Sequence, residues 1–152
     1  TERGMGREPQ TTFSTCFGAP FMALPSAVYA RLLRDKINKH KVNCWLVNTG
    51  LSGGPFGVGE RIKIAHTRAM IRAILNDSLS NVPTRLDPIF NLHVPVSCEG
   101  ISHEILDPRN TWRNPSDYDK VALDLASKFS KNFEEFAPDV SHEVREAGPR
   151  AR

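Results

Sequence analysis

Five of the ten residues from Gly50 to Gly59 are glycines, and the basic residues Arg61 and Lys63 follow them closely. Glycine adopts positive φ angles without strain and lets a ligand come close to the backbone, because it has no Cβ atom. A glycine-rich loop that leads into a basic, helix-starting segment is typical of sites that hold anions or nucleotides. This segment is therefore our first candidate for a nucleotide site.

The loop differs from the P-loop that grips the triphosphate of ATP. Gly54 and Gly59 have the G-x-x-x-x-G spacing, but Glu60 and Arg61 stand where Lys and Ser or Thr should follow. The ammonium that holds the phosphates and the hydroxyl that binds Mg²⁺ are both missing. We therefore expect the loop to contact a part of the ligand other than the triphosphate. A simpler interpretation, a glycine-rich connection between two strands with no ligand, stays open.

The segments on either side of the loop indicate what would position it. The apolar run at residues 42–47 predicts a strand buried on both faces, with the loop at its carboxyl end, where open α/β sheets place their ligands. After the loop, alternating apolar and basic residues predict a short extended stretch. Thr67 is then expected to cap a helix that ends near Leu75. The apolar stripe of this helix is expected to be Met70, Ile71 and Ile74.

Two further helices carry clear start signals. Pro25 and Ser26 predict a helix that runs to about His40. Residues 115–117, Pro-Ser-Asp, predict the start of a long helix. The apolar residues at helical spacing in that helix are Tyr118, Val121, Ala122, Leu125, Ala126, Phe129, Phe133 and Phe136. Between the central and the last helix, the prolines of residues 83–95 restrict the chain to irregular or edge-strand structure.

The composition bounds the class of protein. A chain of 152 residues, 39% of them hydrophobic, is long enough to bury one modest core. The net charge of +3 comes from 20 basic and 17 acidic residues, and no long run of Lys and Arg is interleaved with aromatics. Nucleic acid is therefore not an expected partner. No apolar run approaches the length of a membrane span, so we expect a soluble α/β protein and no membrane partner.

The cysteines and histidines do not form a recognisable reactive or metal-binding pattern. The three cysteines are Cys16, Cys44 and Cys98. Their odd number and wide spacing argue against a disulfide framework and fit a reducing compartment, and each is expected to be a small buried residue instead of a nucleophile. The five histidines never fall at metal-ligand spacing. We therefore predict no metal site in this chain.

Several separate blocks of the sequence resemble the ATP-dependent phosphoenolpyruvate carboxykinases, in the order in which that family has them. The blocks are residues 11–21 (TTFSTCFGAPF), 45–50 (WLVNTG), 61–64 (RIKI), 67–71 (TRAMI) and 107–112 (DPRNTW). The resemblance covers nearly the whole chain and weakens in the first few residues and after about Ala137. One departure is Leu51, because members of the family often have Trp after Asn-Thr-Gly.

The resemblance implies an α/β fold, the C-terminal part of the nucleotide-binding mobile domain of a carboxykinase. Residues 1–10 would be a polar lead-in, residues 11–137 part of the nucleotide-binding domain, and residues 138–152 a C-terminal tail. Family members are much longer, and their phosphate loop, metal ligands and oxaloacetate-binding residues lie upstream of the matched region. This segment alone is therefore expected to be inactive and to contain no catalytic residue.

The same resemblance implies site residues and ligands. The family's Arg-Ile pair after this loop, and a Thr five residues after that Ile, contact the adenine nucleotide; the matching positions are Arg61, Ile62 and Thr67. A guanidinium can stack on a purine, an Ile side chain can contact the ring, and a hydroxyl can bond to an edge. For Arg61 a surface salt bridge with Glu60 or a neighbouring acid is the more ordinary alternative.

The parent enzyme would convert oxaloacetate and ATP to phosphoenolpyruvate, ADP and carbon dioxide in gluconeogenesis, with Mg²⁺ and Mn²⁺ as its metals. A stand-alone, non-catalytic adenine-nucleotide-binding or interaction module is the alternative. We expect a cytoplasmic location. The ending Pro149-Arg-Ala-Arg152 is one residue short of an Ala-Arg-Leu peroxisomal signal, so a peroxisome-like organelle is the alternative if the natural chain continues to that Leu.

Overall fold

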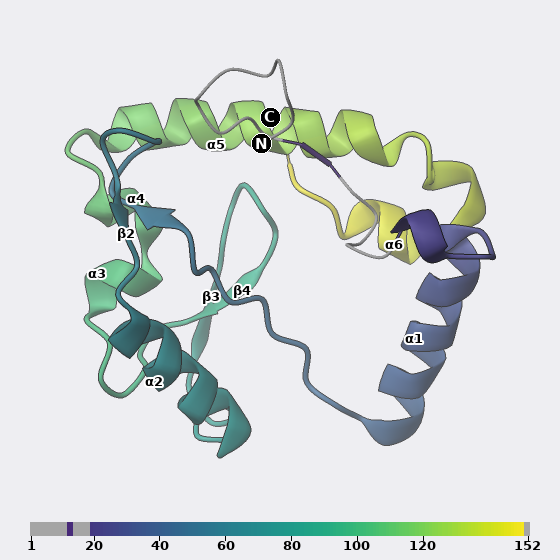
Figure 1. Cartoon of the computed structure of the whole chain (residues 1–152), viewed down its shortest axis with the longest axis horizontal. Helices are drawn as coiled ribbons and strands as arrows, with labels where there is room; N and C mark the ends of the chain where they lie inside the picture. The colour runs from purple at the N-terminus through teal and green to yellow at the C-terminus, as the bar shows by residue number, and fades with distance from the viewer. Residues whose placement is uncertain (1–11, 14–18, 151–152) are drawn as a thin grey trace. The chain divides into compact units, whose positions relative to one another are not determined.

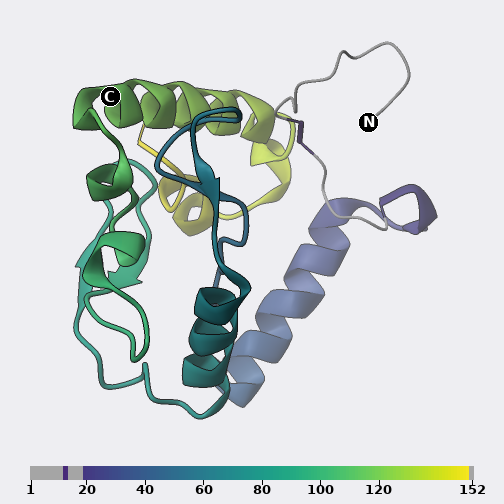
Figure 2. The same cartoon turned by 60° about the vertical axis from the view of Figure 1, so that its left-hand side comes forward.

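The computed structural model of the chain describes residues 12–13 and 19–150, which divide into two compact units. The first unit takes the chain up to Cys44 together with residues 131–146, and the second takes residues 45–130 and the residues after 146. Helices and short strands are both present, so the expected mixture of α and β structure is confirmed (Figure 1 and Figure 2). The boundaries expected at residues 10 and 137 stay a prediction.

The first unit is helical. Its longest element, α1 (Ser26–His40), begins and ends where the sequence predicts, and Lys41 ends it in the left-handed conformation, with φ 53°. None of the side chains of α1 is buried. A short helix, α6 (His142–Glu146), and single 3₁₀ turns at Ala19–Phe21 and Ala137–Asp139 complete the described part of this unit.

The second unit contains two antiparallel pairs of short strands. Strand β1 (Leu51–Ser52) pairs with β2 (Glu60–Arg61), and β3 (Thr84–Leu86) pairs with β4 (His93–Pro95). Both described sheets have only two strands, so every strand in them is an edge strand. The edge-strand prediction for residues 83–95 is therefore confirmed.

The segment at residues 42–47 does not form the predicted strand, and this prediction is wrong for the described chain. The segment has no regular secondary structure, Cys44 is exposed, and the side chain of Leu46 is 83% exposed. A strand buried on both faces takes its hydrogen bonds and its cover from flanking strands. The described part of the chain provides no such neighbours here.

Helix α2 (Ile64–Leu75) ends at the predicted residue but starts three residues before Thr67. Lys63 occupies the N-cap in an extended conformation, and the Thr67 amide already donates to the Lys63 carbonyl at 3.2 Å. Thr67 therefore lies in the first turn and does not cap the helix, because residues 64–66 continue the helix toward the loop. The prediction of its start was wrong.

The remaining helices of the second unit follow the β3–β4 pair in the sequence. They are the short helices α3 (His103–Leu106) and α4 (Pro108–Thr111) and the long helix α5 (Pro115–Phe133), which belongs to this unit as far as Ser130. α5 starts at the predicted Pro115 and buries Ala122 and Ala126. It stops before Phe136, the last residue of the expected stripe.

The buried core of the second unit is small. Ala73, Leu79 and Cys98 form one buried cluster. Partly buried side chains pack against it from Trp45, Met70, Ile74, Val82, Ile101 and Leu106. Ile71, expected in the same stripe as Met70, is instead 41% exposed. Many large apolar side chains are exposed, including Leu75 at 80% and Ile64 at 71%.

None of the helices within the described ranges combines the length and the apolar character that crossing a membrane requires.

Candidate functional site

The glycine-rich loop joins the two antiparallel strands β1 and β2. Leu51 lies opposite Arg61, and Ser52 lies opposite Glu60. The amide of Ile62 donates to the Gly50 carbonyl at 2.9 Å, which extends the pairing by one step. The loop is thus a connection between strands in its geometry, and not the end of a strand in a parallel sheet as expected. Helix α2 follows β2 almost at once (Figure 1).

The two ends of the loop approach each other backbone to backbone. The Pro55 carbonyl accepts from the amides of Val58, at 3.0 Å, and Gly59, at 2.8 Å. A Cβ atom added at Gly59 would lie 2.2 Å from the Gly54 carbonyl oxygen, a distance that no side chain can occupy. Gly54 and Gly59 therefore serve close packing of the loop on itself. This explains their G-x-x-x-x-G spacing without a bound phosphate.

A cavity of about 410 Å³ lies beside this hairpin. Its lining combines charged, hydroxyl and apolar side chains with one glycine: Ser52, Gly53, Val58, Glu60, Arg61, Ile62, Lys63, His66, Ile105 and Thr111. The basic side chains Arg61 and Lys63 outnumber the one carboxylate, Glu60. Such a lining can accept a ligand that has both a flat apolar part and hydrogen-bonding edges.

The structure brings two of the three predicted site residues together. Arg61, which is exposed, and Ile62, which is partly buried, both line the cavity. Thr67 does not line it and lies one residue beyond His66, which does. The ion pairs among the described residues do not include Arg61, so the alternative salt bridge with Glu60 does not form.

Thr111 is a residue of this cavity that sequence reasoning missed. Its hydroxyl, at the end of α4, accepts hydrogen bonds from the Ser52 hydroxyl at 3.2 Å and from the Gly53 amide at 3.1 Å. The residues that bond are 58 and 59 positions apart in the sequence, so no local pattern connects them. The only signal was that residue 111 belongs to the DPRNTW block.

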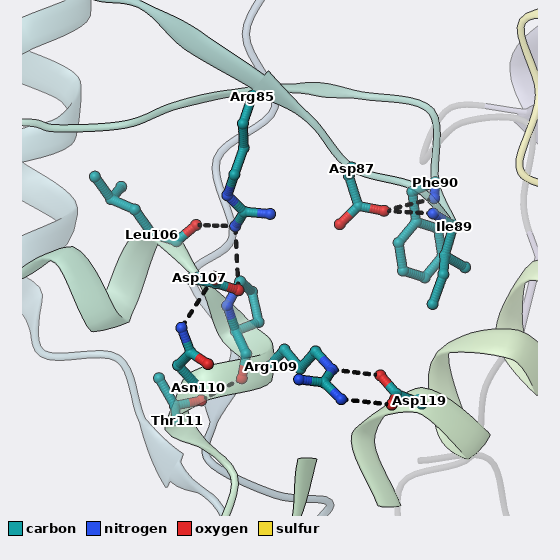
Figure 3. A network of polar contacts seen from close by, with 11 residues as sticks. Arg85, Asp87, Ile89, Phe90, Leu106, Asp107, Arg109, Asn110, Thr111 and Asp119 are labelled. Carbon is teal, nitrogen blue, oxygen red and sulfur yellow. Dashed lines mark hydrogen bonds and ion pairs between the residues drawn. The ribbon is translucent and has the colours of Figure 1, made fainter. Parts of the chain in front are cut away.

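Two ion pairs fix the segment that carries Thr111, as Figure 3 shows. The Arg109 guanidinium donates to both oxygens of Asp119 on α5, at 2.8 and 2.9 Å, and Arg85 on β3 lies 3.1 Å from Asp107. The hydrogen bond from Arg109, together with its positive charge, lowers the pKa of Asp119. The same hydrogen bond raises the pKa of Arg109. Both groups of this pair are therefore charged near neutral pH.

A second, larger cavity of about 590 Å³ has a mainly apolar lining. Its apolar side chains include Leu46, Leu51, Leu92, Val94, Trp112 and Leu125. Tyr118 also lines it, and burial, with the nearby carboxylates of Asp87 and Asp107, raises the pKa of the Tyr118 hydroxyl. The lining of this cavity is more apolar than that of the cavity beside the hairpin.

The described residues offer little support for metal or thiol chemistry. Over residues 12–13 and 19–150, no group of three or more His, Cys, Asp and Glu side chains is placed to hold a metal ion. Burial raises the pKa of the Cys98 thiol, which makes it a poor nucleophile because the thiolate is the reactive form. Both Cys44 and Cys98 are free thiols, and Cys98 is buried as expected. Cys44 is exposed, so the prediction of a buried residue is wrong there, and Cys16 lies outside the described residues.

Comparison with known proteins gives consistent matches. The family profile described as phosphoenolpyruvate carboxykinase matches residues 1–104. A protein of Caldanaerobacter subterraneus subsp. tengcongensis named phosphoenolpyruvate carboxykinase (ATP) is 53% identical over 150 residues, which are 99% of this chain and 28% of the relative. Proteins of the same name from Geotalea uraniireducens and Thermus thermophilus are 54% and 50% identical, over 95% and 99% of this chain. This chain spans only 27–28% of the length of these relatives.

Proposed function

The chain belongs to the phosphoenolpyruvate carboxykinase family, and on that premise we propose that it is the C-terminal part of an ATP-dependent carboxykinase, which we call the full-length carboxykinase. That enzyme converts oxaloacetate and ATP to phosphoenolpyruvate, ADP and carbon dioxide, a step of gluconeogenesis. Loss of carbon dioxide leaves an enolate, whose oxygen takes the γ-phosphoryl group of ATP. Catalysis of such a transfer consists mainly of alignment and charge neutralisation.

In this enzyme the present chain supplies the adenine side of the nucleotide pocket. One observation carries this assignment: the β1–β2 hairpin places Arg61 and Ile62 on the same cavity. The guanidinium of Arg61 stacks on the purine and donates to acceptors near it, and Ile62 contacts the ring through its apolar side chain. Thr67, in the first turn of α2, lies outside the lining of this cavity, and we assign its hydroxyl or backbone to one edge of the base only from its match to the family motif.

The triphosphate and its metals belong elsewhere in the full-length carboxykinase. The two residues directly after Gly59 are Glu60 and Arg61 instead of Lys and Ser or Thr, and the described residues offer no set of ligands that fits Mg²⁺ or Mn²⁺. We therefore assign the metal ligands and the oxaloacetate site to the part of the enzyme outside these 152 residues. The present chain orients the nucleotide, and the rest of the enzyme carries out phosphoryl transfer.

The exposed apolar surface supports a place within a larger domain, the nucleotide-binding mobile domain of the family. Leu46 is 83% exposed, and it lines the apolar cavity together with Leu51 and Val94. Residues 42–47 have the sequence of a buried strand and lack the neighbours that would make them one. Additional strands from the full-length carboxykinase would cover this surface and complete the sheet.

The free thiols of Cys44 and Cys98 suit the reducing cytoplasm, where we place the enzyme.

The test is the Arg61→Ala variant of the full-length carboxykinase. Loss of a desolvated cation–π contact costs about 1–2 kcal/mol, so KM for ATP should rise about 5- to 30-fold. The turnover number should change much less, because the adenine is distant from the reacting bond. Arg72→Ala is the matched control, since Arg72 is an exposed arginine of α2 that lines neither cavity. An unchanged KM for ATP in Arg61→Ala contradicts the assignment.

The intact mass of the protein in its native source distinguishes the carboxykinase proposal from the stand-alone alternative. A mass several times the 17.0 kDa of this chain supports the carboxykinase proposal. A native mass equal to 17.0 kDa would instead establish a separate adenine-nucleotide-binding or interaction module, because the chain alone has no grip for a triphosphate.

A further inference from the structure

We propose that Thr111 is a positioning residue of the nucleotide cavity, which holds the glycine-rich hairpin in place so that Arg61 and Ile62 face the ligand. This inference rests on the proposed function. It assigns to the end of α4 a role that concerns nucleotide binding and not only the stability of the fold.

The Thr111 hydroxyl uses its full hydrogen-bonding capacity. It donates its one proton to the Pro108 carbonyl at 2.7 Å, within α4. Its oxygen accepts from the Ser52 hydroxyl at 3.2 Å and from the Gly53 amide at 3.1 Å, both from the hairpin. A hydroxyl has one donor and two acceptor sites. This single group therefore connects the helix to two consecutive residues of the loop.

The backbones also meet at this point. Gly53 has a φ of +81°, and a Cβ atom added there would lie 3.2 Å from the Thr111 carbonyl oxygen. The positive φ favours glycine at residue 53, and a side chain there would also need the Thr111 carbonyl to move by a few tenths of an ångström. The approach of the loop to the end of α4 is built into the chain at Gly53 as well as at Thr111.

A shift of Thr111 would also move Arg61 and Ile62, because the hairpin connects them. Ser52 is paired with Glu60, and Leu51 with Arg61, in strands of only two residues each. So short a pair has few other restraints, and the bonds from Thr111 are a large part of what fixes β1. Thr111 itself lines the same cavity as Arg61 and Ile62.

Helix α4 is a firm anchor for this contact, as Figure 3 shows. Arg109 binds Asp119 of α5 through two hydrogen bonds, and Asp107 binds Arg85 of β3. The Asp107 carboxylate also accepts from the side-chain amide of Asn110 at 3.0 Å. Two elements of the second unit therefore hold α4 from residues on both sides of Pro108. A displacement at Thr111 is thus taken up by the hairpin and not by the helix.

The experiment compares Thr111→Val with Thr111→Ser in the full-length carboxykinase. Valine keeps the shape and removes all three hydrogen bonds, while serine keeps the hydroxyl. We expect Thr111→Val to raise KM for ATP about 5- to 10-fold, with KM for oxaloacetate unchanged, because even a small misplacement of binding groups is costly. Thr111→Ser should recover most of the affinity. Thr84→Val, at an exposed threonine of β3 outside both cavities, is the control.

The outcomes distinguish this inference from the proposed function. If Arg61→Ala raises KM for ATP and Thr111→Val does not, Thr111 is not a positioning residue while the nucleotide assignment stands. If neither variant changes it, the nucleotide assignment fails. An equal rise in the KM of both substrates, with a lower melting temperature, shows a purely structural role and overturns the inference. Should Thr111→Val not fold, Ser52→Ala removes one of the two loop bonds and should raise KM for ATP by a smaller factor; no rise in that variant overturns the inference too.

Discussion

Replacing Gly59 by alanine should damage the nucleotide cavity far more than replacing Gly57, although both glycines lie in the same loop. A Cβ atom at residue 59 would lie 2.2 Å from the Gly54 carbonyl oxygen and 2.9 Å from its carbon. At residue 57 the added Cβ would meet no atom within 4 Å, and only the positive φ of 86° opposes alanine. The two variants thus separate steric overlap from backbone strain.

The expected magnitudes follow from these distances. Nonbonded heavy atoms are comfortable at about 3.5 Å, so the Gly54 carbonyl must retreat by roughly 1 Å in Gly59→Ala. Residue 59 directly precedes β2, so the shift reaches both Arg61 and Ile62, and we expect kcat/KM for ATP to fall about 30-fold, the upper end of the loss expected for Arg61→Ala. Gly57→Ala costs about 1–2 kcal/mol of backbone strain, at a residue that does not line the cavity. We expect its kcat/KM to fall less than about 10-fold.

The assay is the initial rate of the full-length carboxykinase with ATP varied at saturating oxaloacetate, together with the melting temperature of each variant. The account predicts a much larger loss of kcat/KM for ATP in Gly59→Ala than in Gly57→Ala. Equal losses in the two variants would refute the reasoning, because they would mean that the two ends of the loop do not touch in the enzyme, or that the loop does not position Arg61.

Two further predictions concern pH and the isolated chain. Arg109 lowers the folded-state pKa of Asp119 below its ordinary value of 3.8, so the stabilisation from this pair is complete above that value and is lost as the pH falls through the folded-state pKa. The stability difference between wild type and Asp119→Asn, measured by chemical unfolding, should therefore shrink below about pH 4; a difference that grows there would contradict this. The isolated 152-residue chain, which lacks a phosphate grip, should bind ATP and adenosine with similarly weak affinity in titration calorimetry. Tight, Mg²⁺-dependent binding of ATP would contradict that prediction.

The helices with strong local start signals could be predicted from the sequence. Pro115 is the first residue of α5, a position that suits proline, and Pro25 occupies the N-cap of α1, directly before Ser26. The start of α2 was missed. Thr67 is a good capping residue, but residues 64–66 also form helix. Two starts are therefore compatible with the local sequence, and the signals in it do not choose between them.

The failed strand at residues 42–47 has a different cause. Its apolar residues predict that the segment is buried, but they do not indicate which strands would cover it. The side chains of Leu46 and Val42 are 83% and 52% exposed, so neither reaches the burial that its apolar character favours. The apolar content of residues 42–47 predicts burial, but a strand also needs neighbouring strands, and the described part of the chain offers none here.

The candidate site was only half visible in the sequence. Arg61 and Ile62 were found because they follow the loop directly and match a family motif. Thr111 was not found, because its contact with Ser52 and Gly53 joins residues 58 and 59 positions apart. The glycine spacing was noticed for its similarity to a phosphate loop, whereas Gly54 and Gly59 are required by the contact between their own backbones.

Photolabelling with an azido nucleotide shows whether this chain forms the adenine side of a nucleotide pocket. The full-length carboxykinase would be irradiated with 8-azido-ATP, with and without excess ATP, and the modified peptides mapped by mass spectrometry. The account predicts labelling within residues 50–68 that excess ATP prevents. Labelling that ATP prevents and that maps wholly outside these 152 residues would contradict it.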